Sequence, residues 1–536
     1  MALSTCKKSE FIVFLKVLVK IALAVGLAAI LSSCGTSPGY SYTVGGTVTG
    51  MVGSGLVLQN NLGDDEKITV NSVFSFPTAL TDGAAYSVTV QTPPTSPSQT
   101  CVVSNGSGTI NGAPVSNVIV NCTMSAGPVV VDPSNSFAYV SNFNSTNISA
   151  YAIQSGGSLS QITGPFTAGT NPNPVTFYPQ TSGASAYYAY VSNVSSGMSS
   201  GTISAYSIDN SSGALNPICG GSTQPVCPST GEYPTQVAVA TVSGNTYAYV
   251  ANMGDGTISA YSIDNSSGAL TPLCGGSGTA CPLAGTSPTS VIIDPNNKLA
   301  YVPNMISGTI SVFAINDDGT LSLVETALAG TYPISITVAA ETSGTYAYVA
   351  NMGSNDICVY TIDYNYASDN VLPLSQGTTI GTQGTSPMSV TIYPQTGGAG
   401  AYYAYVSNVG SQNISVFTIT GGALSTPALV TTGVNPNPVT IYVDSSTTPP
   451  TAYAYVSNMG DGTIYTYTIG SGLLTNPQIT YLTTNILFPS ISSPTTVTID
   501  SQGPYAYVSD MSTGIVAAFT ITTGSGPLGG QLTRVQ

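Results

Sequence analysis

From residue 42 onward, apolar and polar side chains alternate along the chain with a period of two. The stretches YTVGGTVTG, GLVLQN, YSVTVQT and SNVIVNC show this alternation early in the chain, and turn residues such as those at 60–63 separate them. Such alternation is typical of half-buried β-strands joined by tight turns. The pattern therefore predicts an all-β protein.

Residues 42–123 form the first predicted domain. Seven short strand-like segments in about eighty residues favour a small β-sandwich of immunoglobulin-like type. The segment resembles the spacer modules of bacterial surface proteins. Its one charge run, Asp64-Asp65-Glu66, is interpreted as a solvated turn.

A longer pattern begins at Gly127 and recurs to the C-terminus. Its centre is an aromatic strand that ends in Tyr-Val-x-Asn, with Asp in place of Asn in the last copy. The first and last of these tyrosines, Tyr139 and Tyr507, are seven intervals apart, which gives a period of about 53 residues. The eight copies are Tyr139–Asn142, Tyr190–Asn193, Tyr249–Asn252, Tyr301–Asn304, Tyr348–Asn351, Tyr405–Asn408, Tyr455–Asn458 and Tyr507–Asp510.

Each copy contains four strand-like parts. One follows a proline, the Tyr-Val-x-Asn strand is second, a cleanly alternating segment such as ISAYSI is third, and a variable stretch near a leucine is fourth. Four antiparallel strands make one blade of a propeller, and a ring of blades removes exposed sheet edges. We therefore predict a β-propeller over residues 127–536, with eight blades favoured and seven as the alternative.

This repeat resembles the YVTN-repeat, lactonase-like family of β-propellers. The resemblance covers about 410 residues. Members are often seven-bladed, and the family name implies hydrolysis of lactones.

The N-terminal region has the layout of a secretory signal. Four lysines lie in residues 1–20, and residues 21–31 are apolar, too short a run to span a bilayer. Leu31-Ser32-Ser33-Cys34 resembles the lipobox of bacterial lipoproteins. The resemblance implies a signal peptide at 1–33, a lipidated Cys34 and a tether over 34–41. Gly35 then suggests an exported lipoprotein of the outer membrane or cell surface. The alternative is a plain secretory leader with an incidental cysteine.

Charge and composition exclude several functions. The net charge is −15, and outside the leader the only cations are Lys67, Lys298 and Arg534. Binding to nucleic acid requires clustered cations, so nucleic acid is not an expected partner. The chain contains no histidine, which removes Ser-His-Asp triads and imidazole metal sites.

Six cysteines are candidates for disulfides in an exported chain. Cys101 and Cys122 lie near the end of the first domain. Two adjacent repeats carry matching close pairs after the third strand, and Cys358 is interpreted as a buried structural thiol. The two matching pairs are Cys219 with Cys227 and Cys274 with Cys281.

Acidic residues at the ends of the first strands are the candidates for chemistry. First strands line the channel of a propeller, so these carboxylates are candidates to hold Ca²⁺ or Mg²⁺; no other cofactor is expected. The favoured alternative is that each Asp starts a turn. The four channel candidates are Asp132, Asp294, Asp444 and Asp500.

Two functions remain open from the sequence. The favoured one is a non-enzymatic, surface-anchored propeller that binds a protein or glycan, because catalytic residue types are missing and no catalytic residue can be named. The alternative is a hydrolase of neutral lactones or esters that uses channel acids or a bound metal, motivated by the family resemblance.

Overall fold

The computed structural model contains β-strands as its regular elements, and no helix among its described residues is long and apolar enough to cross a membrane. It describes residues 40–535 apart from 50, 52–54, 71, 95–99, 124, 180–182, 196–198, 221–223, 276–279, 366–371, 395–401, 483–489, 501–502, 525 and 527. The predicted signal peptide 1–33 and Cys34, with nearly all of the tether 34–41, lie outside the described residues. The chain divides into two compact units, and the main boundary between them along the sequence lies near residue 121.

The first unit contains two four-stranded sheets, β5-β2-β10-β8 and β4-β3-β7-β9, and a short β1-β6 pair. Alternate residues of its strands are buried, for example Leu56 and Leu58, so the period-two pattern marks the core here. The strands are β1 (Ser41–Tyr42), β2 (Val44–Thr49), β3 (Leu56–Asn60), β4 (Asp64–Ile68), β5 (Val73–Ser75), β6 (Leu80–Thr81), β7 (Ala85–Thr92), β8 (Thr100–Ser104), β9 (Ser107–Thr109) and β10 (Val115–Thr123).

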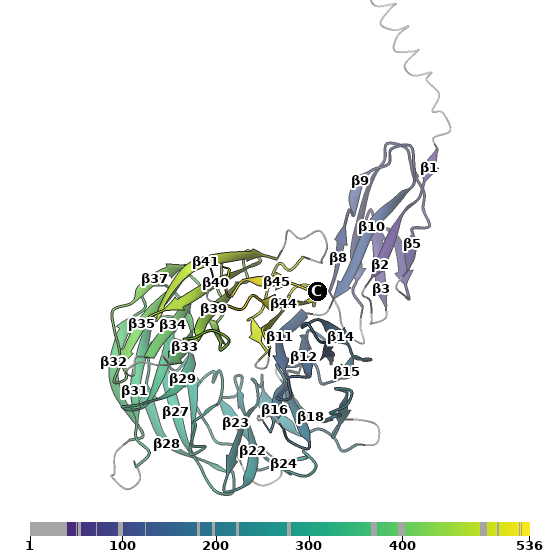
Figure 1. Cartoon of the computed structure of the whole chain (residues 1–536). Coiled ribbons are helices and arrows are strands. Elements are labelled where there is room, and N and C mark those ends of the chain that lie inside the picture. The colour runs from purple at the N-terminus through teal and green to yellow at the C-terminus, as the bar shows by residue number, and fades with distance from the viewer. Residues whose placement is uncertain are drawn as a thin grey trace, which may run out of the picture. The chain divides into compact units, whose positions relative to one another are not determined.

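The second unit is a β-propeller, in which the described residues form eight sheets that follow one another around a ring (Figure 1). Each sheet is built from consecutive antiparallel strands, and three sheets carry a short fifth strand. The described residues therefore form eight blades, the number that the count of repeats favours.

The strands take the same order in every blade. The first strands are β11 (Ser125–Val131), β16 (Thr176–Tyr178), β21 (Ala238–Val242), β25 (Ile292–Ile293), β29 (Pro333–Glu341), β33 (Pro387–Pro394), β38 (Thr440–Asp444) and β42 (Thr498–Ile499). The second strands are β12 (Phe137–Phe143), β17 (Tyr187–Asn193), β22 (Asn245–Asn252), β26 (Leu299–Asn304), β30 (Gly344–Asn351), β34 (Tyr402–Asn408), β39 (Thr451–Asn458) and β43 (Tyr505–Ser509). The third strands are β13 (Asn147–Ile153), β18 (Ser200–Ile208), β23 (Thr257–Ile263), β27 (Thr309–Ile315), β31 (Asp356–Ile362), β35 (Asn413–Thr420), β40 (Thr463–Gly470) and β44 (Val516–Ile521). The outer strands are β14 (Leu159–Gln161), β15 (Phe166–Thr167), β19 (Leu215–Pro217), β20 (Ser229–Glu232), β24 (Leu270–Pro272), β28 (Leu321–Leu328), β32 (Leu374–Gly381), β36 (Ala423–Leu424), β37 (Ala428–Thr431), β41 (Leu473–Tyr481) and β45 (Leu532–Arg534).

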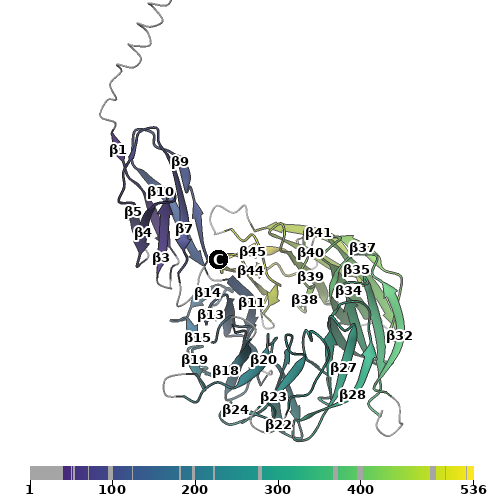
Figure 2. The same ribbon diagram turned by 180° about the vertical axis from the view of Figure 1, so that it is seen from behind.

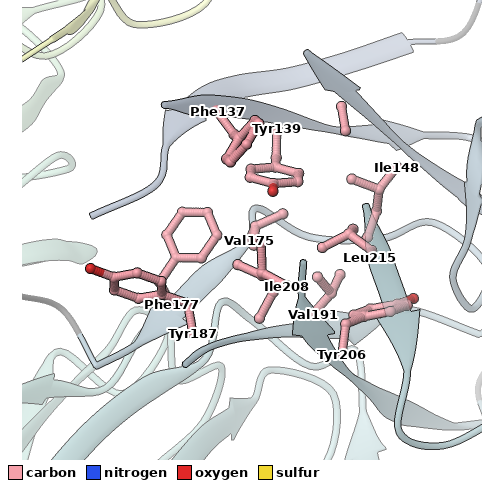
Figure 3. Close-up of a cluster of buried hydrophobic side chains, with 12 residues drawn as sticks. Phe137, Tyr139, Ile148, Val175, Phe177, Tyr187, Val191, Tyr206, Ile208 and Leu215 are labelled. Atoms are coloured by element: carbon pink, nitrogen blue, oxygen red, sulfur yellow. The ribbon is translucent and has the colours of Figure 1, made fainter. Parts of the chain in front are cut away.

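The second strand of each blade shows why the aromatic motif recurs. In β22, Tyr247 and Tyr249 pack against the following blade, whereas Ala248 and Val250 pack against the preceding one. Large side chains on one face thus meet small ones on the facing blade, which fills the space between the twisted sheets. Figure 3 shows the first such interface, where Tyr139 packs against Phe177 with ring centroids 5.6 Å apart.

A hydrogen bond between neighbouring blades accompanies this packing. The second tyrosine of the motif donates its hydroxyl to a glycine carbonyl in the next blade, between the third and fourth strands. A Cβ on that glycine would collide with the aromatic residue that lies two positions before the bonding tyrosine. The aromatic strand of one blade therefore requires a glycine in the next blade. The bonds are Tyr139 to Gly213 (2.9 Å), Tyr190 to Gly268 (3.0 Å), Tyr249 to Gly319 (2.8 Å), Tyr348 to Gly422 (3.2 Å), Tyr405 to Gly472 (2.9 Å) and Tyr455 to Gly530 (2.8 Å).

The ring closes through side chains between the last blade and the first. Tyr507 and Ala518 of the last blade share a hydrophobic cluster with Val129 of the first. Strand β11 contacts β42 and β43 across this seam, and Figures 1 and 2 both show the first and last blades next to each other. The hydroxyls of Thr498 and Ser509 donate to carbonyls of the first blade. Each sheet takes its strands from one repeat, so no strand is exchanged across the closure.

Disulfides join the two matching cysteine pairs, Cys219–Cys227 and Cys274–Cys281, in adjacent blades. Cys101 and Cys122 are also disulfide-bonded. Cys358 is free and buried, and its Sγ lies 3.3 Å from the Nδ2 of Asn351. Serine occupies the equivalent place in most other blades, so this thiol is part of the structural pattern of the blade.

Candidate functional site

The two ends of the propeller are formed by different connections. Turns from first to second strands and loops from third to fourth strands lie at one end, which we call the turn end. Loops from second to third strands and linkers between blades lie at the other, which we call the loop end. This division follows from the antiparallel order of strands in every blade.

The four acids predicted to ring the channel lie at the turn end. Asp294 is 2% exposed, and its carboxylate accepts backbone N–H bonds from Asn296, Lys298 and Leu299 at 3.1, 2.6 and 2.8 Å. Asp132, also 2% exposed, accepts N–H bonds from Ser134, Ser136 and Phe137 in the same way. Each carboxylate organises its own turn, as expected for an Asp that initiates one.

The other two predicted acids are equally buried. Asp444 accepts bonds from Ser446 and, at 2.6 Å, from the N–H of Gly524 in the next blade. Burial alone would raise the pKa of Asp444, but these hydrogen bonds outweigh it and hold the pKa below its usual value. Asp500 is 4% exposed and begins the turn between β42 and β43. Within the described part of the chain, no three acidic or cysteine side chains gather as metal ligands.

The loop end carries an apolar residue directly after each Tyr-Val-x-Asn motif. In seven blades its backbone N–H donates to a carbonyl in the linker that precedes the blade, at 2.9–3.2 Å. Together with the equivalent residue of the first blade, these residues form a ring of apolar residues around the loop end. The residues of the ring are Phe143, Val194, Met253, Met305, Met352, Val409, Met459 and Met511.

The linker residue that accepts this bond has an unusual backbone. In six blades it has a positive φ of 48–58° and directly precedes a proline, where extended conformations are favoured. Asn tolerates the left-handed region, but a bulky side chain there costs about 1–2 kcal/mol. Tyr233 and Tyr332 nevertheless occupy two of the six positions. The set is Asn171, Tyr233, Ser287, Tyr332, Ser386 and Asn435.

A pocket of about 550 Å³ opens at the loop end across the first four blades. This volume is in the usual range for sites that bind small molecules. Its wall combines apolar side chains with amides and hydroxyls, and Tyr233 carries the one ionisable side chain of the lining. The lining residues are Phe143, Asn171, Asn173, Val194, Ser195, Tyr233, Pro234, Thr235, Gln236, Met253 and Thr289.

Two acids neighbour the pocket along the chain, and they differ in their bonding. Asp255 accepts the N–H of Glu232 at 3.0 Å and both the N–H and hydroxyl of Thr257, so its carboxylate holds the loop together. Gly256 follows it with a φ of 73°, as a tight hairpin turn requires. Glu232 directly precedes Tyr233, is partly exposed, and among the described residues its carboxylate has no hydrogen-bond partner.

The sequence did not reveal this pocket, because its walls come from loops of four different blades. One signal was available: an apolar residue follows the Asn or Asp that ends the motif in all eight copies, at a place where a surface loop would otherwise be polar. The predicted acids and the pocket lie at opposite ends of the second strands, so the structure does not bring them together.

A family model described as "Lactonase, 7-bladed beta-propeller" matches residues 188–336 and 236–366. This part of the chain is similar to lactonase propellers. Eight of the eleven pocket residues, from Val194 to Thr289, fall within the matched region. The description gives seven blades, whereas the described residues of this chain form eight sheets. None of the curated proteins matches the chain.

Solved structures similar to this chain include a putative 6-phosphogluconolactonase of Bacteroides fragilis, with 19% identity, TM-score 0.46, and coverage of 66% of this chain and 95% of that one. The periplasmic gluconolactonase of Pseudomonas aeruginosa has 17% identity, TM-score 0.45, and coverage of 69% and 98%. The dihydro-heme d1 dehydrogenase NirN has 11% identity, TM-score 0.48, and coverage of 77% and 72%. Likenesses this distant say nothing about what the chain binds.

Proposed function

We propose that this propeller is a lactonase-type hydrolase that takes a neutral lactone, or a related neutral ester, into the loop-end pocket. The match of the lactonase family model to most of the pocket wall carries the proposal. This match therefore favours a hydrolase over the binding module, which the lack of catalytic residue types in the sequence suggested.

The neutral lining supports a neutral substrate. Recognition of a phosphate group calls for Arg or Lys, and the pocket wall contains neither. Asn171, Asn173 and Gln236 offer amide groups that bind hydroxyls and carbonyls of an uncharged ring. The amide nitrogen of Asn173 donates to the carbonyl of Pro234 at 2.7 Å and to the hydroxyl of Ser192 at 3.1 Å, which holds the side chain in place.

We assign Glu232 as the group that activates water. Glu232 is the last residue of β20 and directly precedes Tyr233 of the pocket wall. Its carboxylate accepts no hydrogen bond among the described residues, whereas the carboxylate of Asp255 accepts three within its loop. The carboxylate takes a proton from water as the water oxygen bonds to the lactone carbonyl carbon. The ring C–O bond then breaks and the departing oxygen takes up the proton, which gives a hydroxy acid. A positioned base contributes about 10²–10⁴-fold in rate.

The test is hydrolysis of glucono-δ-lactone and its 6-phosphate by the purified full chain. We expect turnover above the spontaneous rate, no preference for the phosphorylated compound, and a kcat at least a hundredfold lower in Glu232→Gln with KM unchanged. Asp209→Asn, which removes an exposed carboxylate at the turn end, is the matched control and should keep full activity. Absence of turnover on neutral lactones would refute hydrolysis; full activity of Glu232→Gln would refute the role of Glu232.

A binding function without turnover is the second candidate. The observation that favours it is the lack of any acidic or basic side chain in the pocket wall itself. Export and a lipid anchor at Cys34 remain part of the proposal, and the disulfides are typical of an oxidising compartment. The mass of the mature N-terminal peptide, with or without acyl chains on Cys34, tests the anchor.

A further inference from the structure

Two exposed tyrosines occupy equivalent places at the loop end, two blades apart. Tyr233 precedes the third blade and is 41% exposed, and Tyr332 precedes the fifth blade and is 45% exposed. Their φ angles are 50° and 55°. Asn or Ser stands at this place in four other blades, so the fold does not require an aromatic ring there. The fold thus uses a left-handed backbone at this place but does not require a bulky side chain there, and strained residues of this kind gather at functional sites.

Each tyrosine ring rests on a glycine of the facing loop. A Cβ on Gly254 would lie 2.8 Å from Cδ2 of Tyr233, and one on Gly353 would lie 2.7 Å from Cδ2 of Tyr332. Neither glycine has a positive φ, so close approach of the ring is the reason that glycine fits. The rings are thus held in place on one side and open to solvent on the other.

Apolar side chains continue between the two rings. Met253 is 37% exposed in the loop of the third blade, and Ile306 is 59% exposed in the loop of the fourth. We call Tyr233, Met253, Ile306 and Tyr332 the tyrosine platform. Exposed apolar side chains gathered over three successive blades mark a surface for a partner.

Charge restricts the chemistry of that partner. The described cations are Lys67 on β4, Lys298 in a turn at the turn end and Arg534 on β45 of the last blade, so none lies in the loops of the third to fifth blades that carry the platform. The acids Glu232 and Asp255 lie beside the platform and repel anions. An anionic polymer therefore has no counter-charge here. Exposed tyrosines beside amides and hydroxyls suit the apolar faces and hydroxyl edges of neutral sugars.

We propose that the tyrosine platform binds an extended neutral glycan, with one sugar ring on Tyr233 and another, further along the chain, on Tyr332. Because the two rings lie two blades apart, a single sugar cannot contact both, and a glycan of several units is required. The proposal stands apart from hydrolysis, since Tyr332 does not line the pocket and binding is measured without turnover.

The test is calorimetric titration of the full chain with cellohexaose, maltohexaose, laminarihexaose, mannohexaose and chitohexaose, and with the matching disaccharides. We expect at least one hexasaccharide to bind at least tenfold more tightly than its disaccharide, with an affinity that stays constant between 50 and 500 mM NaCl. Failure of all five to bind would overturn the proposal. An affinity that falls with salt would overturn it too, because it would indicate a charged partner.

Three variants locate the binding. Tyr332→Asn removes the ring but keeps a residue that tolerates the left-handed backbone, as Asn171 and Asn435 do, so the fold is preserved. We expect its affinity to fall at least tenfold. Tyr332→Phe keeps the ring, and Tyr481→Asn removes an exposed ring from β41; both should stay within about twofold of the wild type. Unchanged affinity in Tyr332→Asn would overturn the proposal, whatever the lactone assay shows.

Discussion

The turn end of the propeller repeats two structural interactions with fixed residue types, whereas at the loop end the residue types differ from blade to blade. The hydroxyl-to-glycine bond occurs in six blades, and the buried turn-forming Asp occurs in four. At the loop end, the strained linker position holds Asn, Ser or Tyr, and the pocket spans the first four blades. The comparison indicates that interactions at the turn end stabilise the propeller, whereas the residues at the loop end form the candidate binding surfaces.

Alkaline pH should have the largest effect, and it acts on the turn end. Burial raises the pKa of the six bonding tyrosines, Tyr249 among them, well above the usual value of 10. They stay neutral in the folded chain but ionise in the unfolded one. Their contribution is therefore complete below pH 10 and is lost as the pH rises further, at roughly 1 kcal/mol per tyrosine per pH unit.

Six such tyrosines are sufficient to unfold the propeller between about pH 10 and 12, since domains are stable by about 5–15 kcal/mol. Circular dichroism and tyrosinate absorbance, followed together from pH 8 to 12, measure this. We expect most of the absorbance to appear together with the loss of strand signal. Full ionisation with the strand signal intact would show that the bonding tyrosines are not buried as described.

A pair of Asp substitutions compares the two ends directly. Asp294 and Asp255 each accept three hydrogen bonds, but Asp294 is buried at the turn end and Asp255 is exposed at the loop end. We expect Asp294→Ala to cost about 2–4 kcal/mol, because buried N–H groups lose their partner, and Asp255→Ala to cost less than about 1 kcal/mol. Denaturant unfolding measures both. Equal losses of unfolding free energy in the two variants would contradict the conclusion that the turn end contributes more to stability than the loop end.

The smallest expected effect concerns single hydroxyl groups. Tyr249→Phe removes the bond to Gly319 and leaves that carbonyl without its partner, at a cost of about 1 kcal/mol. Tyr233→Phe removes an exposed hydroxyl at the loop end and should leave the stability unchanged. Thermal unfolding of the two variants measured side by side gives the difference in stability. An equal loss of stability in both variants would contradict the prediction.

The sequence predicts the parts of this fold that repeat. The Tyr-Val-x-Asn strands, the four strands of each blade and the disulfides Cys219–Cys227 and Cys274–Cys281 follow from local spacing, because each depends on neighbours within one repeat. Interactions between blades do not show in this way. The bond from Tyr139 to Gly213 joins residues 74 positions apart. Only the structure shows that the tyrosine of one repeat and the glycine of the next form one interaction.

The candidate site was harder to predict for the same reason. The sequence offered acids at the ends of the first strands as candidates for chemistry and favoured a role in starting turns, and Asp132 and Asp294 do bind their own turns. The pocket assembles from loops of four blades and contains no motif of catalytic residues. The left-handed backbone of Tyr233 is imposed by the linker in which it lies, and a tyrosine in the sequence does not indicate such a backbone.

Closure of the ring without strand exchange has a consequence for how this architecture can change. The seam between the last and first blades, held by Thr498, Ser509 and a cluster around Tyr507, is formed by side chains, as the interfaces between the other blades are. New chain ends placed in any other linker would therefore leave every sheet continuous, so circular permutants should assemble the same ring. Gain or loss of a whole repeat likewise disturbs no sheet internally, which makes the number of blades a variable that duplication can change.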